Sequence, residues 1–274
     1  MALRHKEGKV IDTPKLMLGD CIERLKEIDT GSVAMVLMDP PYGTTNYGWD
    51  KQRIDLDSLW AEIWRVCRDN AAVLSWAADP FGFALVESSP NEYRYKYMIL
   101  KNRASNFPNA RKMPLRVFEE VLVFYRLQPC YVPLMEQGHP RKTARRKGIS
   151  AGETLYNAMG ENLYDSTERY PVNVRFYDWR AAEDMGRNHP SRKPLAACRD
   201  FILTYTQKGD TVLDPFMGSG TVGIACAETG RGFIGVEMDA AFFEGAKERV
   251  EDAFNRKTPI AGIFSPVESE DGNK

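Results

Sequence analysis

The stretch that decides the fold reads Thr211-Val-Leu-Asp-Pro-Phe-Met-Gly218-Ser-Gly220-Thr-Val-Gly223. A short apolar run, three glycines in GxGxxG spacing and a further apolar segment predict a strand, a tight loop and a helix in succession. Glycines at these positions remove Cβ atoms, so that a ligand can lie against the backbone. The next apolar run ends in Glu237, whose carboxylate can accept hydrogen bonds from two ribose hydroxyls. The glycine loop and Glu237 together predict a ligand that contains a nucleoside. They do not identify which ligand, because NAD would bind to the same features.

A second buried strand, expected over 32–38, also ends in a polar loop. The loop that follows this strand is Asp39-Pro40-Pro41-Tyr42. The prolines withhold N–H donors, so this loop presents carbonyl oxygens and the Asp39 carboxylate as acceptors beside an aromatic ring. Such acceptors suit an exocyclic amine that gains positive charge, and Tyr42 could stack on a flat base. The alternative is a structural turn in which Asp39 caps a backbone N–H and Tyr42 is simply packed.

Helix-like and strand-like segments alternate around these two loops, which predicts a doubly wound, mostly parallel α/β sheet. Upstream we expect an edge segment over 12–18, helices over 20–28, 56–68 and 81–87, and strands over 71–76, 93–101 and 119–126. Periodicity stops over 127–188. It returns with helices over 194–202, 221–225 and 240–255 and strands over 211–214 and 232–237. Ligands of open α/β sheets bind beyond the carboxyl ends of strands, so both loops are expected at such an edge.

Length and composition limit the possible classes of protein. A chain of 274 residues with 43% apolar and 27% charged residues suits one large domain with an insertion, and excludes disorder of the whole chain. The longest apolar run, Val33 to Met38, is far shorter than the roughly 18 residues of a membrane span. Without that span or a signal peptide, a cytoplasmic location is expected.

The net charge of −1 conceals a basic region. Between Lys101 and Lys147 there are eleven Lys and Arg residues against three Glu, a local charge of +8. The densest part, Arg141-Lys-Thr-Ala-Arg-Arg-Lys147, has Pro and Gly on both sides. It is expected in a surface loop, where it could neutralise phosphates. A solvated loop without a partner is the alternative.

Cysteine and histidine spacing argues against a metal. The five cysteines are scattered without a CxxC pair, and the three histidines are not in HExxH spacing. We therefore expect reduced, packed thiols and no metal site.

Four ordered motifs resemble those of the S-adenosylmethionine-dependent DNA amino-methyltransferases of the permuted β group. They are Leu18-Gly-Asp20-Cys21, Asp39-Pro-Pro-Tyr42, His189-Pro-Ser-Arg-Lys-Pro194 and Asp214-Pro-Phe-Met-Gly-Ser-Gly-Thr221. The resemblance implies a Rossmann-like methyltransferase sheet with an inserted target-recognition region. By it, residues 1–126 form the catalytic part of the core, 127–188 the target-recognition insertion, 189–257 the cofactor-binding part and 258–274 a flexible tail.

The resemblance also implies roles for individual residues. Asp39, Pro40 and Tyr42 would bind and activate the target amine, which attacks the sulfonium methyl directly. Asp20 and Cys21 would meet the adenine of the cofactor, Glu237 its ribose, and Ser191 and Lys193 its methionine carboxylate. The whole implied cofactor set is Asp20, Cys21, Asp39, Ser191, Lys193, Asp214, Phe216, Gly218, Gly220, Thr221 and Glu237. Two simpler roles stay open: Asp20 as a helix N-cap, and Lys193 as a solvent-exposed lysine.

The implied partner is double-stranded DNA, from which the target base is flipped out. The implied DNA contacts are Arg111, Lys112, Arg141, Lys142, Arg145, Arg146 and Lys147. An Asp at the first position of the catalytic motif resembles N6-adenine members, whereas N4-cytosine members more often have Ser, so N6-adenine is favoured and N4-cytosine is the alternative. The sequence leaves open a homodimer and an accompanying restriction endonuclease.

Two other classes of protein compete with this interpretation. A nicotinamide-dependent oxidoreductase would explain the glycine loop and Glu237, but it leaves the Asp39 loop and the basic region unused. A catalytically idle nucleic-acid-binding protein would explain the basic region alone.

Overall fold

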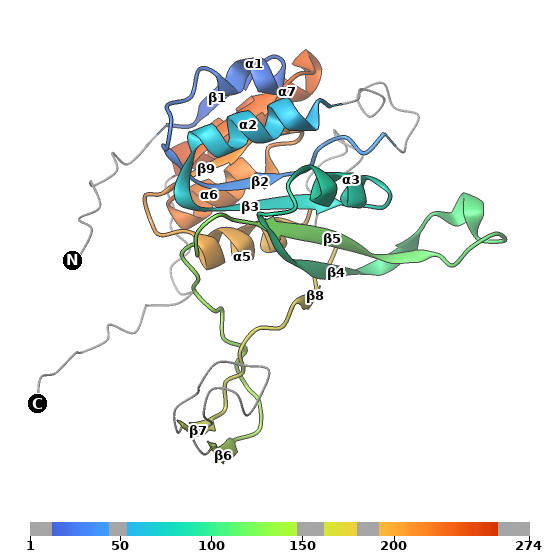
Figure 1. Cartoon of the computed structure of the whole chain (residues 1–274), viewed down its shortest axis with the longest axis vertical. Coiled ribbons are helices and arrows are strands. Elements are labelled where there is room, and N and C mark those ends of the chain that lie inside the picture. Colours follow the sequence, from blue (N-terminus) through green and yellow to red (C-terminus); the bar gives the residue numbers. More distant parts are fainter. Residues whose placement is uncertain (1–12, 44–53, 147–161, 180–191, 257–274) are drawn as a thin grey trace, which may run out of the picture. The chain divides into compact units, whose positions relative to one another are not determined.

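The structure is a computed structural model, and it describes residues 13–43, 54–146, 162–179 and 192–256 (Figure 1). The chain forms two compact units. The larger combines Met1–Val132 with Val174–Lys274, and the smaller is Pro133–Asn173. Within the described ranges, no helix is long and apolar enough to cross a membrane.

An eight-stranded sheet organises the larger unit, in the order β1-β10-β9-β2-β3-β5-β4-β8. Of its strands, β5 runs antiparallel to both neighbours and the remaining pairs are parallel. The predicted mostly parallel α/β sheet is therefore confirmed. The strands are β1 (Lys15–Leu18), β2 (Val33–Met38), β3 (Cys67–Ala77), β4 (Tyr93–Ser105), β5 (Arg116–Phe124), β8 (Val174–Phe176), β9 (Thr211–Asp214) and β10 (Gly232–Glu237).

Helices cover both faces of this sheet. One face carries α1 (Cys21–Leu25), α2 (Leu56–Val66) and α3 (Phe81–Ser88), and the other carries α5 (Leu195–Tyr205), α6 (Thr221–Thr229) and α7 (Ala240–Arg256). Figure 1 shows α2 and α5 on opposite sides of the strands. Strand β2 is buried along its whole length, with Met35 and Leu37 in one core and Val36 and Met38 in the other. Its uninterrupted apolar run follows from burial on two faces.

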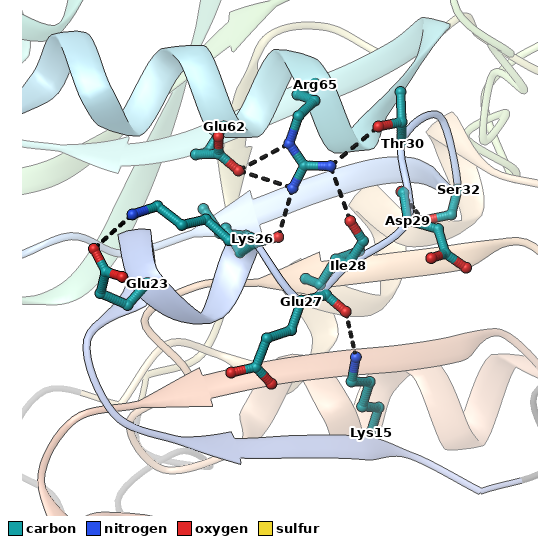
Figure 2. A network of polar contacts seen from close by, with 11 residues as sticks. Lys15, Glu23, Lys26, Glu27, Ile28, Asp29, Thr30, Ser32, Glu62 and Arg65 are labelled. Atoms are coloured by element: carbon teal, nitrogen blue, oxygen red, sulfur yellow. Dashed lines mark hydrogen bonds and ion pairs between the residues drawn. The ribbon is translucent and has the colours of Figure 1, made fainter.

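Arg65 ties α1 to α2 (Figure 2). From α2 its guanidinium donates to the carbonyl oxygens of Leu25 at 2.7 Å and Ile28 at 3.0 Å, and it pairs with Glu62 at 2.8 Å. Leu25 is the last residue of α1 and Ile28 ends the turn that follows it, in which the Ile28 N–H donates to the Leu25 carbonyl oxygen at 3.0 Å. The arginine thus gives both carbonyl oxygens at the end of this segment a further donor. The helix predicted over 20–28 is accordingly shorter, because its last residues form a tight turn that Arg65 holds.

The smaller unit corrects one expectation. Strands β6 (Lys142–Arg146) and β7 (Asn162–Ser166) pair antiparallel, so most of the basic run is a strand and the predicted surface loop is wrong there. Pairing with β7, sixteen or more residues away, decides this conformation, and a local sequence pattern cannot show such a partner. This compact unit, Pro133–Asn173, lies within the span 127–188, and β8, which follows it in the chain, pairs with β4 in the main sheet.

The sheet has a switch point between β9 and β2. From β9 the chain passes through α6 to β10 on one side, and from β2 it passes through α2 to β3 on the other. The two strands are direct neighbours, with Met35 opposite Val212 and Val36 opposite Leu213. Crevices at the carboxyl ends of such strands are the usual ligand sites of open α/β sheets.

Candidate active site

The two loops singled out in the sequence meet at this switch point. Asp39 follows β2, and Asp214 is the last residue of β9. Both line a cavity of about 40 Å³ whose wall also includes Lys193, Phe216 and Thr221. The catalytic and cofactor motifs, 175 residues apart along the chain from Asp39 to Asp214, thus share one cavity.

Asp39 is held at both carboxylate oxygens. The Tyr42 hydroxyl donates to Oδ1 at 2.6 Å, and the Lys193 ammonium lies 2.9 Å from Oδ2. Pro40, the residue after Asp39 in the chain, is buried. The Tyr42 ring stacks on Phe81, with ring centroids 5.5 Å apart, so part of the simpler alternative holds and this tyrosine is packed. The Asp39 side chain is nevertheless 27% exposed, which leaves it accessible at the cavity.

Lys193 is the centre of a buried ion-pair cluster. Its side chain is 9% exposed, which excludes the alternative that Lys193 is simply a lysine in solvent. Besides Asp39 it contacts Glu119 of β5 at 3.1 Å, and Glu119 in turn pairs with Lys101 of β4 at 2.6 Å. The Lys193 ammonium also lies 5.2 Å from the centre of the Trp76 ring. Two ammonium groups and two carboxylates make this cluster neutral, which is how charges are tolerated in a protein interior.

Burial and ion pairing shift the pKa values of the cluster in different directions. Burial raises the pKa of Asp39 above its ordinary value, against the opposing effects of Lys193 and the Tyr42 hydroxyl. Burial would also raise the pKa of Glu119, but Lys193 and Lys101 together lower it. For Lys193, burial acts to lower the pKa and the two carboxylates raise it beyond its ordinary value. Lys193 is therefore charged, and its charge favours ionised carboxylates on both sides.

The glycine loop is shaped by packing as much as by a ligand. Gly218 and Gly220 have φ of +50° and +77°, in the left-handed region. A Cβ on Gly220 would lie 2.7 Å from the Val250 side chain, and one on Gly223 would lie 2.7 Å from Phe233. Glycine at positions 220 and 223 therefore lets the loop and α6 approach α7 and β10 closely, an expected use of the later glycines in this motif.

Glu237 is oriented by the backbone. Its carboxylate accepts hydrogen bonds from the N–H groups of Gly218 at 2.8 Å and Asp239 at 2.9 Å. Burial raises its pKa, and these N–H groups oppose that effect. Each oxygen retains a lone pair for a further donor. The residue thus stands beside the glycine loop as a fixed acceptor.

Asp20 and Cys21 begin α1 at the neighbouring strand end. Leu18 of β1 is in register with Glu237, and the Gly19 N–H donates to the Glu237 carbonyl oxygen at 2.9 Å. Asp20 caps α1 by accepting from the Glu23 N–H at 3.1 Å, so the N-cap role is present. Cys21 is buried, and burial followed by the nearby Asp20 charge raises the pKa of its thiol to about 12. It is a neutral packing residue, and all five cysteines are free thiols.

The other predicted site residues separate into three sets. Thr221 starts α6 with its hydroxyl 3.1 Å from that of Ser219, and Phe216 donates its N–H to Asp214 at 3.0 Å. Arg111, Lys112, Arg141, Lys142 and Arg145 are exposed, the first two in the larger unit and the others in the smaller. Ser191 and Lys147 and the side chain of Arg146 lie outside the described residues.

Sequence reasoning missed Glu119 and Trp76. Glu119 is one of two adjacent glutamates, and only the alternation of strand faces separates it from Glu120, which pairs with the more exposed Lys96. Trp76 is 1% exposed on β3 and lines the cavity, and its indole N–H has no acceptor within the described part of the chain. A tryptophan at the carboxyl end of a predicted buried strand was the one signal available.

Comparison with known proteins agrees with the geometry. A family model for N6 and N4 DNA methylases matches residues 33–248. The chain belongs to this family and is a DNA methyltransferase.

The DNA adenine methyltransferase YhdJ of Escherichia coli strain K12 is 27% identical over 249 residues, covering 86% of this chain and 82% of YhdJ. Two solved structures share the fold. The M1.HpyAVI–SAM complex superposes with a TM-score of 0.57 at 20% identity, covering 86% of this chain and 98% of the other. The cytosine-N4-specific PvuII DNA methyltransferase gives 0.57 at 18% identity, covering 92% and 96%. Both base specificities therefore occur among similar proteins.

Proposed function

We propose that this chain transfers a methyl group from S-adenosylmethionine to the exocyclic N6 amine of an adenine flipped out of duplex DNA. The observation that carries the proposal is the position of Asp39-Pro40-Pro41-Tyr42 at the carboxyl end of β2, in one cavity with Asp214 of the glycine-loop strand. Acceptors and a nucleoside-binding loop meet there and nowhere else in the sheet as described.

Asp39 is the group we place on the target amine. In adenine the amino lone pair is delocalised into the ring, so the nitrogen is a poor nucleophile. An ionised carboxylate beside the amine accepts its hydrogens and stabilises the positive charge that develops on nitrogen. Since burial raises the pKa of Asp39, the same carboxylate can take up the proton that the methylated amine releases.

Lys193 and Glu119 act on Asp39 and are positioning residues. The Lys193 ammonium fixes Oδ2, while the Tyr42 hydroxyl fixes Oδ1, so the carboxylate plane is set before a base arrives. Glu119 takes a share of the same ammonium, which limits how strongly Lys193 withdraws charge from Asp39. The Lys193 ammonium and the Tyr42 hydroxyl both lower the pKa of Asp39 against the effect of burial, and so favour the ionised form that can accept from the amine.

The residues around the glycine loop fit S-adenosylmethionine. Glu237 would accept from its ribose hydroxyls, and Asp214 from its ammonium group. Asp214 is 3% exposed, and burial raises its pKa well above the ordinary value, a shift that a cation beside it would oppose. When bound, S-adenosylmethionine supplies a methyl group on positively charged sulfur. Phe216 and Thr221 lie on the loop and helix that follow Asp214. The proposed cofactor set remains the one that the resemblance implies: Asp20, Cys21, Asp39, Ser191, Lys193, Asp214, Phe216, Gly218, Gly220, Thr221 and Glu237.

Adenine is proposed over cytosine because the catalytic motif begins with Asp, not Ser. Both bases present a similar amine, so this choice rests on the motif alone. The Pro133–Asn173 unit, with exposed Arg141, Lys142 and Arg145, is proposed to read the DNA sequence.

The test is direct identification of the methylated base. Purified protein is incubated with duplex DNA and S-adenosylmethionine carrying a labelled methyl group, and the DNA is digested to nucleosides for mass spectrometry. Labelled N6-methyladenine is expected. N4-methylcytosine would overturn the base assignment, and label in neither base would overturn the function.

A thermal shift separates the competing oxidoreductase. S-adenosylhomocysteine at a hundred times its dissociation constant should stabilise the protein by about 2.7 kcal/mol, whereas NAD should not. Light scattering and copurification would show whether a second copy of the chain or a restriction endonuclease binds it.

A further inference from the structure

A long hairpin formed by β4 and β5 projects from the sheet (Figure 1). Ala77, the last residue of β3, is opposite Glu120 of β5, and Glu120 is opposite Met98 of β4. Residues 102–118, which we call the arm, therefore lie beyond the carboxyl edge of the parallel strands. Asp39 follows β2 at this same edge.

The root of the arm belongs to the ion-pair cluster. Lys101 and Glu119, the residues that flank the arm, pair at 2.6 Å, and Glu119 reaches Asp39 through Lys193. The direction and origin of the arm are thus fixed relative to the active site.

The tip of the arm is folded and yet apolar on its surface. Asn106 adopts φ of +73° and leads into a single 3₁₀ turn, η2 (Phe107–Asn109), which is closed by the Ala110 N–H donating to the Phe107 carbonyl oxygen at 3.0 Å. Phe107 is 61% exposed and Met113 is 51% exposed. Large apolar side chains held in water on an ordered tip are a mark of an interaction site.

The charge of the arm selects the partner. Between residues 102 and 118 there are four cations and no acidic residue: Arg103, Arg111, Lys112 and Arg116. A polyanion matches this charge, and an apolar side chain flanked by cations suits the sugar edges and base steps of a DNA groove.

We infer that the arm binds duplex DNA at a second point, away from the target base, with Phe107 and Met113 in a groove and Arg111 and Lys112 on the flanking phosphates. The inference rests on the proposed DNA methyltransferase function. At about 3.3 Å per residue, the seven steps from Leu100 to Phe107 span at most roughly 23 Å, which is about seven base pairs of DNA at 3.4 Å each. The tip is too distant to fill the gap left by the flipped base.

The salt dependence of binding to a 40-base-pair mixed-sequence duplex tests the charged part. In the double variant Arg111→Ala/Lys112→Ala, the slope of log affinity against log salt should become shallower by about 1.8, since each lost phosphate contact removes about 0.9. In Phe107→Ser/Met113→Ser, affinity should fall about tenfold with the slope unchanged.

Matched controls lie at the other end of the strands, where the parallel strands begin. Lys208→Ala removes an exposed cation before β9, and Leu127→Ser removes a 59% exposed apolar side chain after β5. Both should bind DNA as the unchanged protein does. Arm variants that behave like these controls would overturn the inference.

A second experiment fixes the distance. Once the methylated site has been mapped, the target adenine is placed 3 or 12 base pairs from each end of a duplex. The unchanged protein should show a lower kcat/KM on the short flanks, and the arm variants should not distinguish the two. Equal rates on both duplexes would overturn the inference while leaving the methyltransferase function intact. Absence of methylation on both duplexes would instead overturn that function. Arm variants that alter sedimentation but not DNA binding would identify the tip as a contact between copies of this chain. That result would also overturn the inference.

Discussion

Two ion pairs in this protein have nearly the same length and very different surroundings. Lys193 lies 2.9 Å from Asp39 at the switch point of the sheet, where the two side chains are 9% and 27% exposed. Arg141 pairs with Asp165 at 2.7 Å in the smaller unit, through two parallel contacts, with exposures of 73% and 36%. Distance ranks the second pair as the stronger. Water screens it, however, so the energetic consequences of the two pairs should be in the reverse order.

The largest expected effect is on catalysis, at the buried pair. Asp39→Ala removes the only carboxylate that we place on the amine, so kcat should fall by at least about 10²-fold, the scale found when an aimed electrostatic group is lost. Methyl transfer from labelled S-adenosylmethionine measures it. DNA retention should be largely intact, and Asp29→Ala, an exposed carboxylate before β2, serves as the matched control. Full activity of Asp39→Ala would discredit the site.

The next effect is on folding. Lys193→Met leaves Asp39 and Glu119 as buried carboxylates without their shared cation, which should destabilise the fold by about 3 kcal/mol. For a domain of this size the melting temperature should drop by about 6–12 °C. Lys15→Met, which removes a surface ammonium that contacts only the Glu27 carbonyl oxygen in the described contacts, should change it little. Equal melting temperatures for the two variants would show that the buried lysine contributes no more to stability than the surface lysine does.

The pH dependence of activity should then move in opposite directions for the two neighbours of Asp39. Lys193 lowers the pKa of Asp39 and Glu119 raises it. Asp39 must be ionised to accept from the amine, so in Lys193→Met the acid limb of the kcat/KM profile should shift to higher pH. In Glu119→Gln it should shift to lower pH. General damage to the site cannot produce shifts of opposite sign.

The smallest effect is at the exposed pair. Asp165→Asn removes the carboxylate that holds the Arg141 guanidinium, and the melting temperature should stay within a degree or two, since exposed pairs contribute little. The freed guanidinium can instead contact phosphate, so affinity for duplex DNA should rise a few-fold, with a salt slope steeper by about 0.9. Calorimetry and anisotropy titrations measure the two quantities. A marked loss of stability would show that screening does not separate the two regions.

The sequence predicts the strands of the sheet much better than it predicts the ion-pair cluster around Lys193. Strands β9 and β10 have the predicted bounds, and β2 begins within one residue of its prediction, because buried parallel strands are continuous apolar runs that end in distinctive loops. The meeting of Asp39 with Asp214 followed from the rule that places ligand sites at the carboxyl ends of strands.

The ion-pair cluster could not be predicted in the same way. Glu119 and Lys101 lie on strands whose antiparallel pairing brings them to the site, and neither residue type nor spacing marks them. The β6–β7 pairing was missed for the same reason, since the strand partner lies in a different part of the chain. Local patterns predict elements well, and long-range pairing decides which side chains of those elements meet.

The position of β9 in the sheet has a consequence during synthesis on the ribosome. This strand lies in the centre, between β10 and β2, yet it is made after β1 to β8. Until residues 211–214 emerge, the nascent chain exposes one edge of the apolar strand β2. Until Lys193 emerges shortly before them, Glu119 and Asp39 lack the lysine that they share. An open apolar edge invites pairing with other chains, so the late segment both closes the sheet and neutralises the centre of the enzyme. The protein cannot acquire a finished active site before Asp214 and Glu237 have been translated.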